Sequence, residues 1–406
     1  MSIRSVARMA VRTGIAVAAV VMLIAARFAA TTVVYSFAGD EDGEYPDTDL
    51  VMDAAGNLYG TTVSGGDFGG GTVFKLSPSG SGWTHTVLYD FTGQTDGGEP
   101  YGGVTLDAAG NLYGTAVVGG TGLACEQGCG VLYQLSNSGG TWTEHVLHNF
   151  TGGADGSGPG SGVTIDAGGS IYGMTPTGGA DALGVIFQVS PNGSGWSFHV
   201  IHTFTGGADG ATGSKGRLLL RSGSLFGVAT AGGTNQSGVA FQLTRSGSKW
   251  NLHPIYEFQG TPDAGFPYGA LSPDAAGNLY GTTYYDGAHN LGCVYRLHRL
   301  PSGQWVESVL HSFTGGADGN GPISNLVFDA AGNLYGTTSE GGTTGLGTIF
   351  ELAARTWQET VVHTFTGSPD GEAPYDGMVS NGAGTYYGAT VRGGVANEGA
   401  IYSFTP

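Results

Sequence analysis

The sequence predicts an all-β fold: a seven-bladed β-propeller with four-stranded blades, whose last blade is closed by the N-terminal strand (3+1 closure). A Tyr/Phe-Gly pair recurs seven times, at Tyr59, Tyr113, Tyr172, Phe226, Tyr280, Tyr335 and Tyr387. A Phe lies 22 residues before each pair, at Phe37, Phe91, Phe150, Phe204, Phe258, Phe313 and Phe365. Repeats of about 50 residues that each hold four short strands are typical of propeller blades.

The two ends of the repeat region favour a ring over a stacked β-solenoid, which is the alternative architecture. The repeats begin with a lone strand, residues 31–37, and end after a third strand, residues 400–404. Pairing these two strands completes a seventh blade and removes the exposed sheet edges of an open stack. A solenoid would instead carry dissimilar caps at its two ends.

Residues 1–30 have the pattern of a secretory signal peptide. Arg4, Arg8 and Arg12 precede an apolar stretch, residues 14–26, and small residues follow near Ala30. The stretch is shorter than the roughly 20 residues that span a bilayer. We therefore expect a secreted, periplasmic or cell-surface protein whose mature part, residues 31–406, is one propeller without a membrane span. An uncleaved anchor is the alternative.

The first repeat shows the predicted strands of every blade. They cover Leu50–Asp53, Leu58–Thr62, Thr72–Leu76 and Trp83–Phe91. The Gly-Asn pair between the first two favours a hairpin, and the alternation of Tyr89 and Phe91 places both on one face of the last strand.

Composition and charge narrow the class of partner. The chain contains 78 Gly, 11% charged residues and a formal net charge of −18. So acidic a surface argues against nucleic acid as a partner. Cys125 and Cys129 lie close together in a Gly-rich loop and are predicted to form a disulfide, whereas Cys293 stands alone. Three Cys are too few for a zinc framework.

The repeated motifs resemble those of a known family. Asp-Ala-Ala-Gly-Asn-Leu-Tyr-Gly-Thr-Thr, Gly-Thr-Val-Phe-Lys-Leu and Phe-Thr-Gly-Gly-Ala-Asp-Gly are similar to the GloVer tandem repeats of bacterial proteins. The resemblance covers essentially the whole mature chain. It implies an exported protein and carries no biochemical role.

Residues that recur in every blade are expected to serve the fold. An Asp follows each recurring Phe by five residues, at Asp42, Asp96, Asp155, Asp209, Asp263, Asp318 and Asp370. We interpret these as turn formers that bond backbone N–H groups. We expect no cofactor and no metal site, because each turn offers one carboxylate where a calcium loop needs several oxygen ligands. Calcium binding at these turns is the alternative.

Residues that differ between blades are the candidates for function. Tyr101, Tyr268 and Tyr375 follow the acidic turn in three blades and are predicted to bind ligand, with packing between blades as the alternative. The most irregular loop holds Tyr284 and Tyr285, also predicted to bind ligand. It holds Asp286 and His289 too, the only catalytic candidates that we name.

These features favour a non-catalytic binding or scaffold propeller that recognises a carbohydrate or a protein, and we expect a monomer. An extracellular carbohydrate-active lyase or hydrolase with its site at the channel mouth is the alternative. The chain has no nucleophile elbow, phosphate loop or dinucleotide fingerprint, so catalysis is the less favoured hypothesis.

Overall fold

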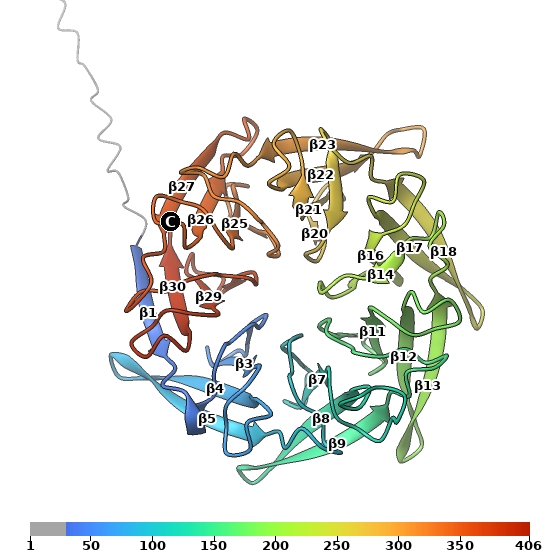
Figure 1. Ribbon diagram of the computed structural model, residues 1–406, viewed down its shortest axis with the longest axis vertical. Coiled ribbons are helices and arrows are strands. Elements are labelled where there is room, and N and C mark those ends of the chain that lie inside the picture. Colours follow the sequence, from blue (N-terminus) through green and yellow to red (C-terminus); the bar gives the residue numbers. More distant parts are fainter. Residues whose placement is uncertain (1–29) are drawn as a thin grey trace, which may run out of the picture.

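The computed structural model describes residues 30–406, which form seven antiparallel sheets arranged in a ring (Figure 1). The predicted signal peptide lies outside these residues apart from Ala30, which begins the first strand. Within residues 30–406, no helix has the length and apolar character needed to cross a membrane. The one helical segment in this part of the chain is a single 3-10 turn, η1 (Asp40–Asp42).

Each blade carries four main strands, named a to d from the axis outward. The a strands are β2 (Val51–Met52), β6 (Val104–Leu106), β10 (Thr164–Ile165), β15 (Leu219–Arg221), β20 (Ser272–Pro273), β24 (Val327–Phe328) and β28 (Val379–Ser380). The b strands are β3 (Leu58–Thr62), β7 (Leu112–Ala116), β11 (Ile171–Thr175), β16 (Ser224–Ala231), β21 (Leu279–Asp286), β25 (Leu334–Thr338) and β29 (Tyr386–Thr390).

The outer half of each blade is longer. The c strands are β4 (Thr72–Ser79), β8 (Val131–Ser138), β12 (Val185–Asn192), β17 (Val239–Ser246), β22 (Cys293–Arg299), β26 (Thr348–Leu352) and β30 (Ala400–Thr405). The d strands are β5 (Gly82–Asp90), β9 (Thr141–Asn149), β13 (Gly195–Thr203), β18 (Lys249–Glu257), β23 (Trp305–Ser312), β27 (Glu359–Thr364) and β1 (Ala30–Ser36). Blades 4 and 5 each add one short strand, β14 (Ala211–Gly213) and β19 (Ala264–Pro267).

The N-terminal strand closes the ring as predicted. β1 pairs antiparallel with β30, and the register runs from Ala30 opposite Thr405 to Ser36 opposite Ala400. The seventh sheet therefore has the order β1-β30-β29-β28, and Figure 1 shows the blue first strand beside the red last one. The prediction of a seven-bladed propeller with 3+1 closure is confirmed.

Aromatic contacts between neighbouring blades form the core. The Phe that follows each d strand is buried and packs on the aromatic residue of strand c in the next blade, as Phe91 does on Tyr133 with ring centres 5.0 Å apart. The same contact occurs at all seven seams, including Phe37 on Phe74 at the closure. This ring also lies over the Gly of the Tyr/Phe-Gly pair: a Cβ at Gly60 would fall 2.7 Å from Phe74 Cζ. The repeated Gly is therefore required by packing.

Six of the seven recurring Asp residues hold the turns after strand d by accepting hydrogen bonds from backbone N–H groups, whereas the Asp263 side chain makes no such bond within residues 30–406. Asp96 accepts hydrogen bonds from the Thr92 amide, 2.9 Å away, and from the Tyr89 hydroxyl, 3.1 Å away. His148 takes the place of this Tyr in its blade, and its Nε2 lies 3.0 Å from Asp155. His and Tyr exchange at this position because either can donate a hydrogen bond to the same carboxylate.

The loops that enter strand a and those that follow strand b lie on one face of the ring. Isolated bridges join them within a blade, for example Glu44 with Ser64 and Glu372 with Arg392. We call this the entry face. On it, Cys125 and Cys129 form a disulfide with an S–S distance of 2.10 Å, whereas Cys293 is a buried free thiol.

Candidate functional site

A ring of non-repeated residues surrounds the axis just before the a strands. The first position of this ring is occupied by Asp47, Tyr101, Gly160, Lys215, Tyr268, Ile323 and Tyr375. Strand a is the innermost strand, so residues that lead into it face the axis near the entry face. Side chains here differ in size, charge and aromatic character from blade to blade, unlike the residues of the turns and seams.

In blade 4, the residues that lead into strand a lie one position later in the repeat than in the other blades, and a shorter a–b turn compensates for this shift. Leu218 is buried like Val163, and its carbonyl accepts a 2.5 Å hydrogen bond from Thr164 just as the Val163 carbonyl does from Thr105. Leu218 is therefore the equivalent of Val163. Val163 precedes Tyr172 by nine residues, whereas Leu218 precedes Phe226, the equivalent of Tyr172, by eight. The a–b turn of blade 4 is correspondingly one residue shorter: Leu219 pairs with Phe226, seven residues on, where Thr164 pairs with Tyr172, eight residues on.

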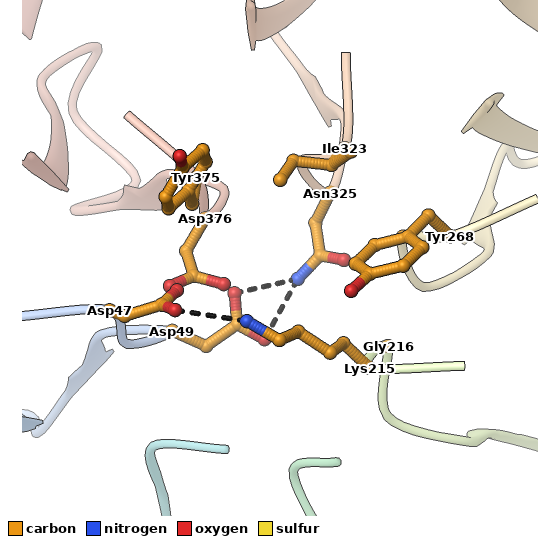
Figure 2. A pocket seen from close by; sticks show the side chains of 10 residues that line it. Asp47, Asp49, Lys215, Gly216, Tyr268, Ile323, Asn325, Tyr375 and Asp376 are labelled. Atoms are coloured by element: carbon orange, nitrogen blue, oxygen red, sulfur yellow. Dashed lines mark hydrogen bonds and ion pairs between the residues drawn. The ribbon is translucent and has the colours of Figure 1, made fainter. Parts of the chain in front are cut away.

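This shift points Lys215 across the ring axis. Its Nζ lies 2.9 Å from Asp47 Oδ2 of blade 1, and Figure 2 shows the ammonium between blades that are three positions apart in the ring. The same Nζ lies 4.9 Å from the centre of the Tyr101 ring, a cation–π contact. Burial alone would lower the pKa of Lys215, but the negative charge of Asp47 and the hydrogen bond to it raise the pKa above its ordinary value. The ammonium is therefore held charged.

A second pair runs beside the first. Arg217 Nη2 lies 3.3 Å from Asp49 Oδ2, and Asn325 Nδ2 donates to both oxygens of Asp49 at 2.8 and 2.9 Å. Asn325 Oδ1 in turn accepts from the Ala270 amide at 2.8 Å, which fixes the orientation of its side chain. Asp47, Asp49, Lys215, Arg217, Asn325 and Asp376 together form what we call the axial cluster.

Asp376 supplies the third carboxyl of the axial cluster. Burial, and next the negative charges of Asp47 and Asp49, raise the pKa of Asp376 well above its ordinary value. Its Oδ2 is shielded from solvent and has no hydrogen-bond partner within residues 30–406. The axial cluster therefore sets two cations, Lys215 and Arg217, among three carboxyl groups, of which Asp376 is the one whose surroundings favour the protonated form.

The axial cluster leaves little free space. All its side chains except Arg217, together with Tyr268, Ile323 and Tyr375, line a cavity of about 20 Å³. A water molecule needs at least about 10–15 Å³ of such space, so one water molecule fits and a sugar ring does not. The axial cluster therefore leaves no room for a sugar ring in this cavity.

The Tyr residues predicted to bind ligand lie at or near this place. Tyr268 and Tyr375 line the axial cavity, and Tyr101 lies under the Lys215 ammonium. Tyr284 continues outward from Tyr268 with ring centres 6.4 Å apart, and Tyr285 follows at 4.4 Å. The structure thus places Tyr101, Tyr268 and Tyr375 at the axis end of the entry face, with Tyr284 and Tyr285 following outward from Tyr268.

Blade 5 carries an unbroken row of four aromatic rings, three of them predicted Tyr residues. Phe266 lies 6.3 Å from Tyr285, which is 52% exposed. The row exists because β19 pairs with the extended end of β21, and this pairing sets Gly265 opposite Tyr285. We call Tyr268, Tyr284, Tyr285 and Phe266 the blade 5 aromatic track. It runs from the closed cavity to the exposed rim.

The two catalytic candidates do not meet. Asp286 is 8% exposed, its Oδ1 accepts a 2.7 Å hydrogen bond from Thr261, and its backbone pairs with Ala264, so it holds the loop in place. His289 is exposed, and the titratable group that its charge affects is His311. No hydrogen bond joins Asp286 to His289 within the described residues, and neither lines the axial cavity. A catalytic role for them stays a prediction.

Residues 30–406 hold no group of three or more His, Cys, Asp or Glu side chains placed to bind a metal ion. The carboxylates of the axial cluster are engaged by Lys215, Arg217 and Asn325 instead.

Sequence reasoning did not find the axial cluster. Asp47 and Asp49 precede a strand like any loop acid, and the constant spacing of 22 residues hides the shift in blade 4. One signal was available in the sequence. Lys215 and Arg217 are two cations separated by a single residue, in a chain that has only 14 Lys and Arg against 32 Asp and Glu.

Comparisons with known proteins agree with the fold. A family model described as Gloeobacter/Verrucomicrobia repeat matches residues 13–125, 121–326 and 221–406. No curated protein matches the sequence. Among solved structures, a hypothetical selenium-binding protein from Sulfolobus tokodaii is similar with a TM-score of 0.57 and 10% identity, covering 88% of each chain. A putative 6-phosphogluconolactonase from Bacteroides uniformis has a TM-score of 0.51 and 13% identity, covering 77% of this chain and 83% of that one. At such identities the likeness concerns the fold alone.

Proposed function

The chain belongs to the Gloeobacter/Verrucomicrobia repeat family, and we propose that this member is an exported, non-catalytic propeller that binds carbohydrate along the blade 5 aromatic track. The observation that supports this proposal is the continuous row of rings from Tyr268 to Phe266. Amphipathic Tyr rings offer an apolar face for a sugar ring and a hydroxyl for hydrogen bonding. Repeated packing residues explain the seams of the ring, but they do not explain this row.

The axial cluster supports binding over catalysis. Its ion pairs engage Asp47 and Asp49 and its cavity is too small for a sugar ring, so a ligand on the blade 5 aromatic track would lie across the entry face beside it. There the rim of the track is solvent-exposed at Tyr285, and the negative charge of Glu340 acts on Tyr284. A carboxylate beside aromatic rings can accept hydrogen bonds from sugar hydroxyls.

Retention of the purified chain on a panel of insoluble polysaccharides tests this proposal. Tyr285→Ala and Phe266→Ala should each weaken retention about tenfold, because each removes one ring from the track. Phe68→Ala is the matched control: Phe68 is 64% exposed in the corresponding loop of blade 1, on the same face. Equal loss in all three variants, or none in the track variants, would contradict carbohydrate binding on blade 5. If the chain binds a protein partner but none of the polysaccharides, the blade 5 aromatic track would instead be a site of protein recognition.

One observation favours a hydrolase as the second candidate. Burial, and next the charges of Asp47 and Asp49, raise the pKa of Asp376 well above its ordinary value, and glycoside hydrolysis uses paired carboxyl groups whose pKa values differ. The closed cavity and the Lys215 pair stand against it, since a hydrolase would require the axial cluster to open.

Release of soluble sugar decides between the two candidates. If the chain hydrolyses a polysaccharide at the axial cluster, Asp376→Asn should abolish release, while Asp286→Asn should leave it unchanged because Asp286 lies outside the cavity. Retention without release supports the binding function.

A further inference from the structure

A groove between blades 5 and 6 opens on the face opposite the entry face. It has a volume of about 740 Å³ and is lined by the a–b turns of both blades together with Tyr280, Arg296, Phe328, Arg355 and Trp357. We call it the blade 5–6 groove. A volume of this size lies within the range of ligand sites.

A shortened c–d hairpin reshapes this seam. In blade 6 the last c–d pair is Leu352 with Glu359, whereas blade 1 continues past the equivalent pair, Leu76 with His85, to Ser79 with Gly82. The hairpin of blade 6 thus lacks the outer end that the hairpins of blades 1 to 4 have. Trp357 consequently lies in the turn with φ 56° instead of in strand d.

The Trp of blade 6 also meets its neighbour differently. Trp196 and Trp250 contact the Tyr of the preceding blade edge-on, at interplanar angles of 71° and 75°. Trp357 is tilted 49° to Tyr280 at 5.8 Å, and Phe328 adds a ring 5.1 Å from Tyr280. Phe328 is the one aromatic residue in an a strand, because the equivalent positions hold Met52, Leu106, Ile165, Leu220, Pro273 and Ser380. An aromatic wall therefore lines this groove.

Two guanidinium groups join the aromatic wall. Arg296 stands where blades 2 and 3 place Gln134 and Gln188, which hydrogen-bond the neighbouring Tyr hydroxyls. The Nε of Arg296 is buried and has no hydrogen-bond partner within residues 30–406. Arg355 is exposed on the shortened hairpin. Neither Arg takes part in any ion pair in this part of the chain.

The carboxylates in the groove are already engaged by their own turns. Asp274 accepts from the Asn278 side chain at 2.7 Å and from the Tyr280 hydroxyl at 3.2 Å. Asp329 accepts in the same way from Asn333 and Tyr335. The groove therefore offers aromatic faces and two N–H donors, the Nε of Arg296 and the exposed guanidinium of Arg355, but few unused acceptors. The charge and hydrogen bonding of Arg296 also act on the Tyr280 hydroxyl, which places its guanidinium beside the aromatic wall.

We propose that the blade 5–6 groove binds a carboxylate-bearing sugar, such as a uronate unit of an acidic polysaccharide. The ring of the sugar would stack on Trp357, and its carboxylate would accept hydrogen bonds from Arg296 and Arg355. Guanidinium groups suit planar carboxylates because they donate two parallel hydrogen bonds. This site is separate from the blade 5 aromatic track and does not depend on the proposed function there.

Calorimetric titration with an oligogalacturonate, against a neutral cello-oligosaccharide of the same length, tests the proposal. The acidic oligosaccharide should bind at least about tenfold more tightly than the neutral one, and Arg296→Gln should remove about tenfold of its affinity. Gln is the natural residue of blades 2 to 4 at this position, so the fold should be retained, and thermal unfolding checks this.

Two controls make the result specific. Arg245→Gln removes the same charge from the same face at the seam of blades 3 and 4, where Arg245 lies over Trp250, and it should not change the affinity. Tyr285→Ala, on the entry face, should not change it either. Equal binding of the two sugars, no binding of either, or equal effects of the two Arg substitutions would each overturn the proposal.

Discussion

Lys215 connects two blades that are three positions apart in the ring and contacts them through one flexible side chain. Its ammonium pairs with Asp47, which is 6% exposed, while its own side chain stays 36% exposed. Removing one partner of a buried pair leaves an uncompensated charge, which costs more than the pair itself contributes. Lys215 is thus a residue on which the axial cluster depends.

Lys215→Met should lower the free energy of unfolding by about 2 kcal/mol, less than for a fully buried pair because Lys215 is partly exposed to solvent. Urea unfolding at pH 7 measures this change. Lys75→Met is the control, since Lys75 contacts the Tyr59 ring at 5.7 Å and forms no ion pair within residues 30–406. Equal losses for the two variants would mean that Lys215 acts through packing alone.

At the scale of the strand, the d strands differ at the position two residues after each Trp. Phe198 stacks on His148 at 3.7 Å, and His85 on Tyr35 at 4.4 Å. In other blades the position holds Glu144, Glu307 or Glu359, and the Oε1 of each is buried without a hydrogen-bond partner. A carboxyl group at such a seam is better accommodated when it is neutral.

The stability of the ring should therefore depend on pH through these groups. Burial, and next the charge of Asp96, raise the pKa of Glu144 from 4.5 to about 7. The folded chain keeps this proton while the unfolded chain releases it near 4.5, so stability falls as pH rises from about 4.5 to about 7.

Glu144→Gln should raise the unfolding free energy at pH 8 by about 1 kcal/mol, after allowance for partial solvent screening, and should leave it unchanged near pH 4.5. Denaturant unfolding at both pH values measures the difference. Glu126→Gln removes an exposed charge and should have no such effect. A gain that does not change with pH would contradict the protonation argument.

At the scale of the whole molecule, the ring is held by one non-covalent closure. β1 pairs with β30, and Phe37 extends this closure to Phe74 of blade 1 at 5.2 Å. Without β1, strand β30 would present an unpaired edge, and the neighbouring seam would lose an aromatic contact.

A chain that begins at Ala38 should therefore fail to form a compact monomer, whereas a chain that begins at Ala30 should remain compact and fold cooperatively. Size-exclusion chromatography and near-ultraviolet circular dichroism compare the two. If the shorter chain is monomeric and unfolds at the same temperature, the closure is not needed and the blades are stable as an open stack.

Much of this architecture could be predicted because it depends on local pattern. Strand positions follow from turn residues and alternation, and the seven copies of Tyr/Phe-Gly follow from one packing contact, the aromatic ring of strand c over Gly. The Tyr residues named from the sequence were found because they depart from the repeat. Asp286 and His289 depart from it too, yet they lie in different surroundings, which spacing along the chain could not reveal.

The sequence by itself determined the number of blades, their strand order and the way the ring closes, because each blade repeats the same short-range pattern. Only the tertiary structure decided what meets at the axis. Lys215 and Asp47 are 168 positions apart, and they become partners because closing the ring brings every a strand to one axis. The shift in blade 4 and the shortened hairpin of blade 6 likewise gain their meaning from neighbouring blades. Contacts between blades depend on geometry that no single repeat contains.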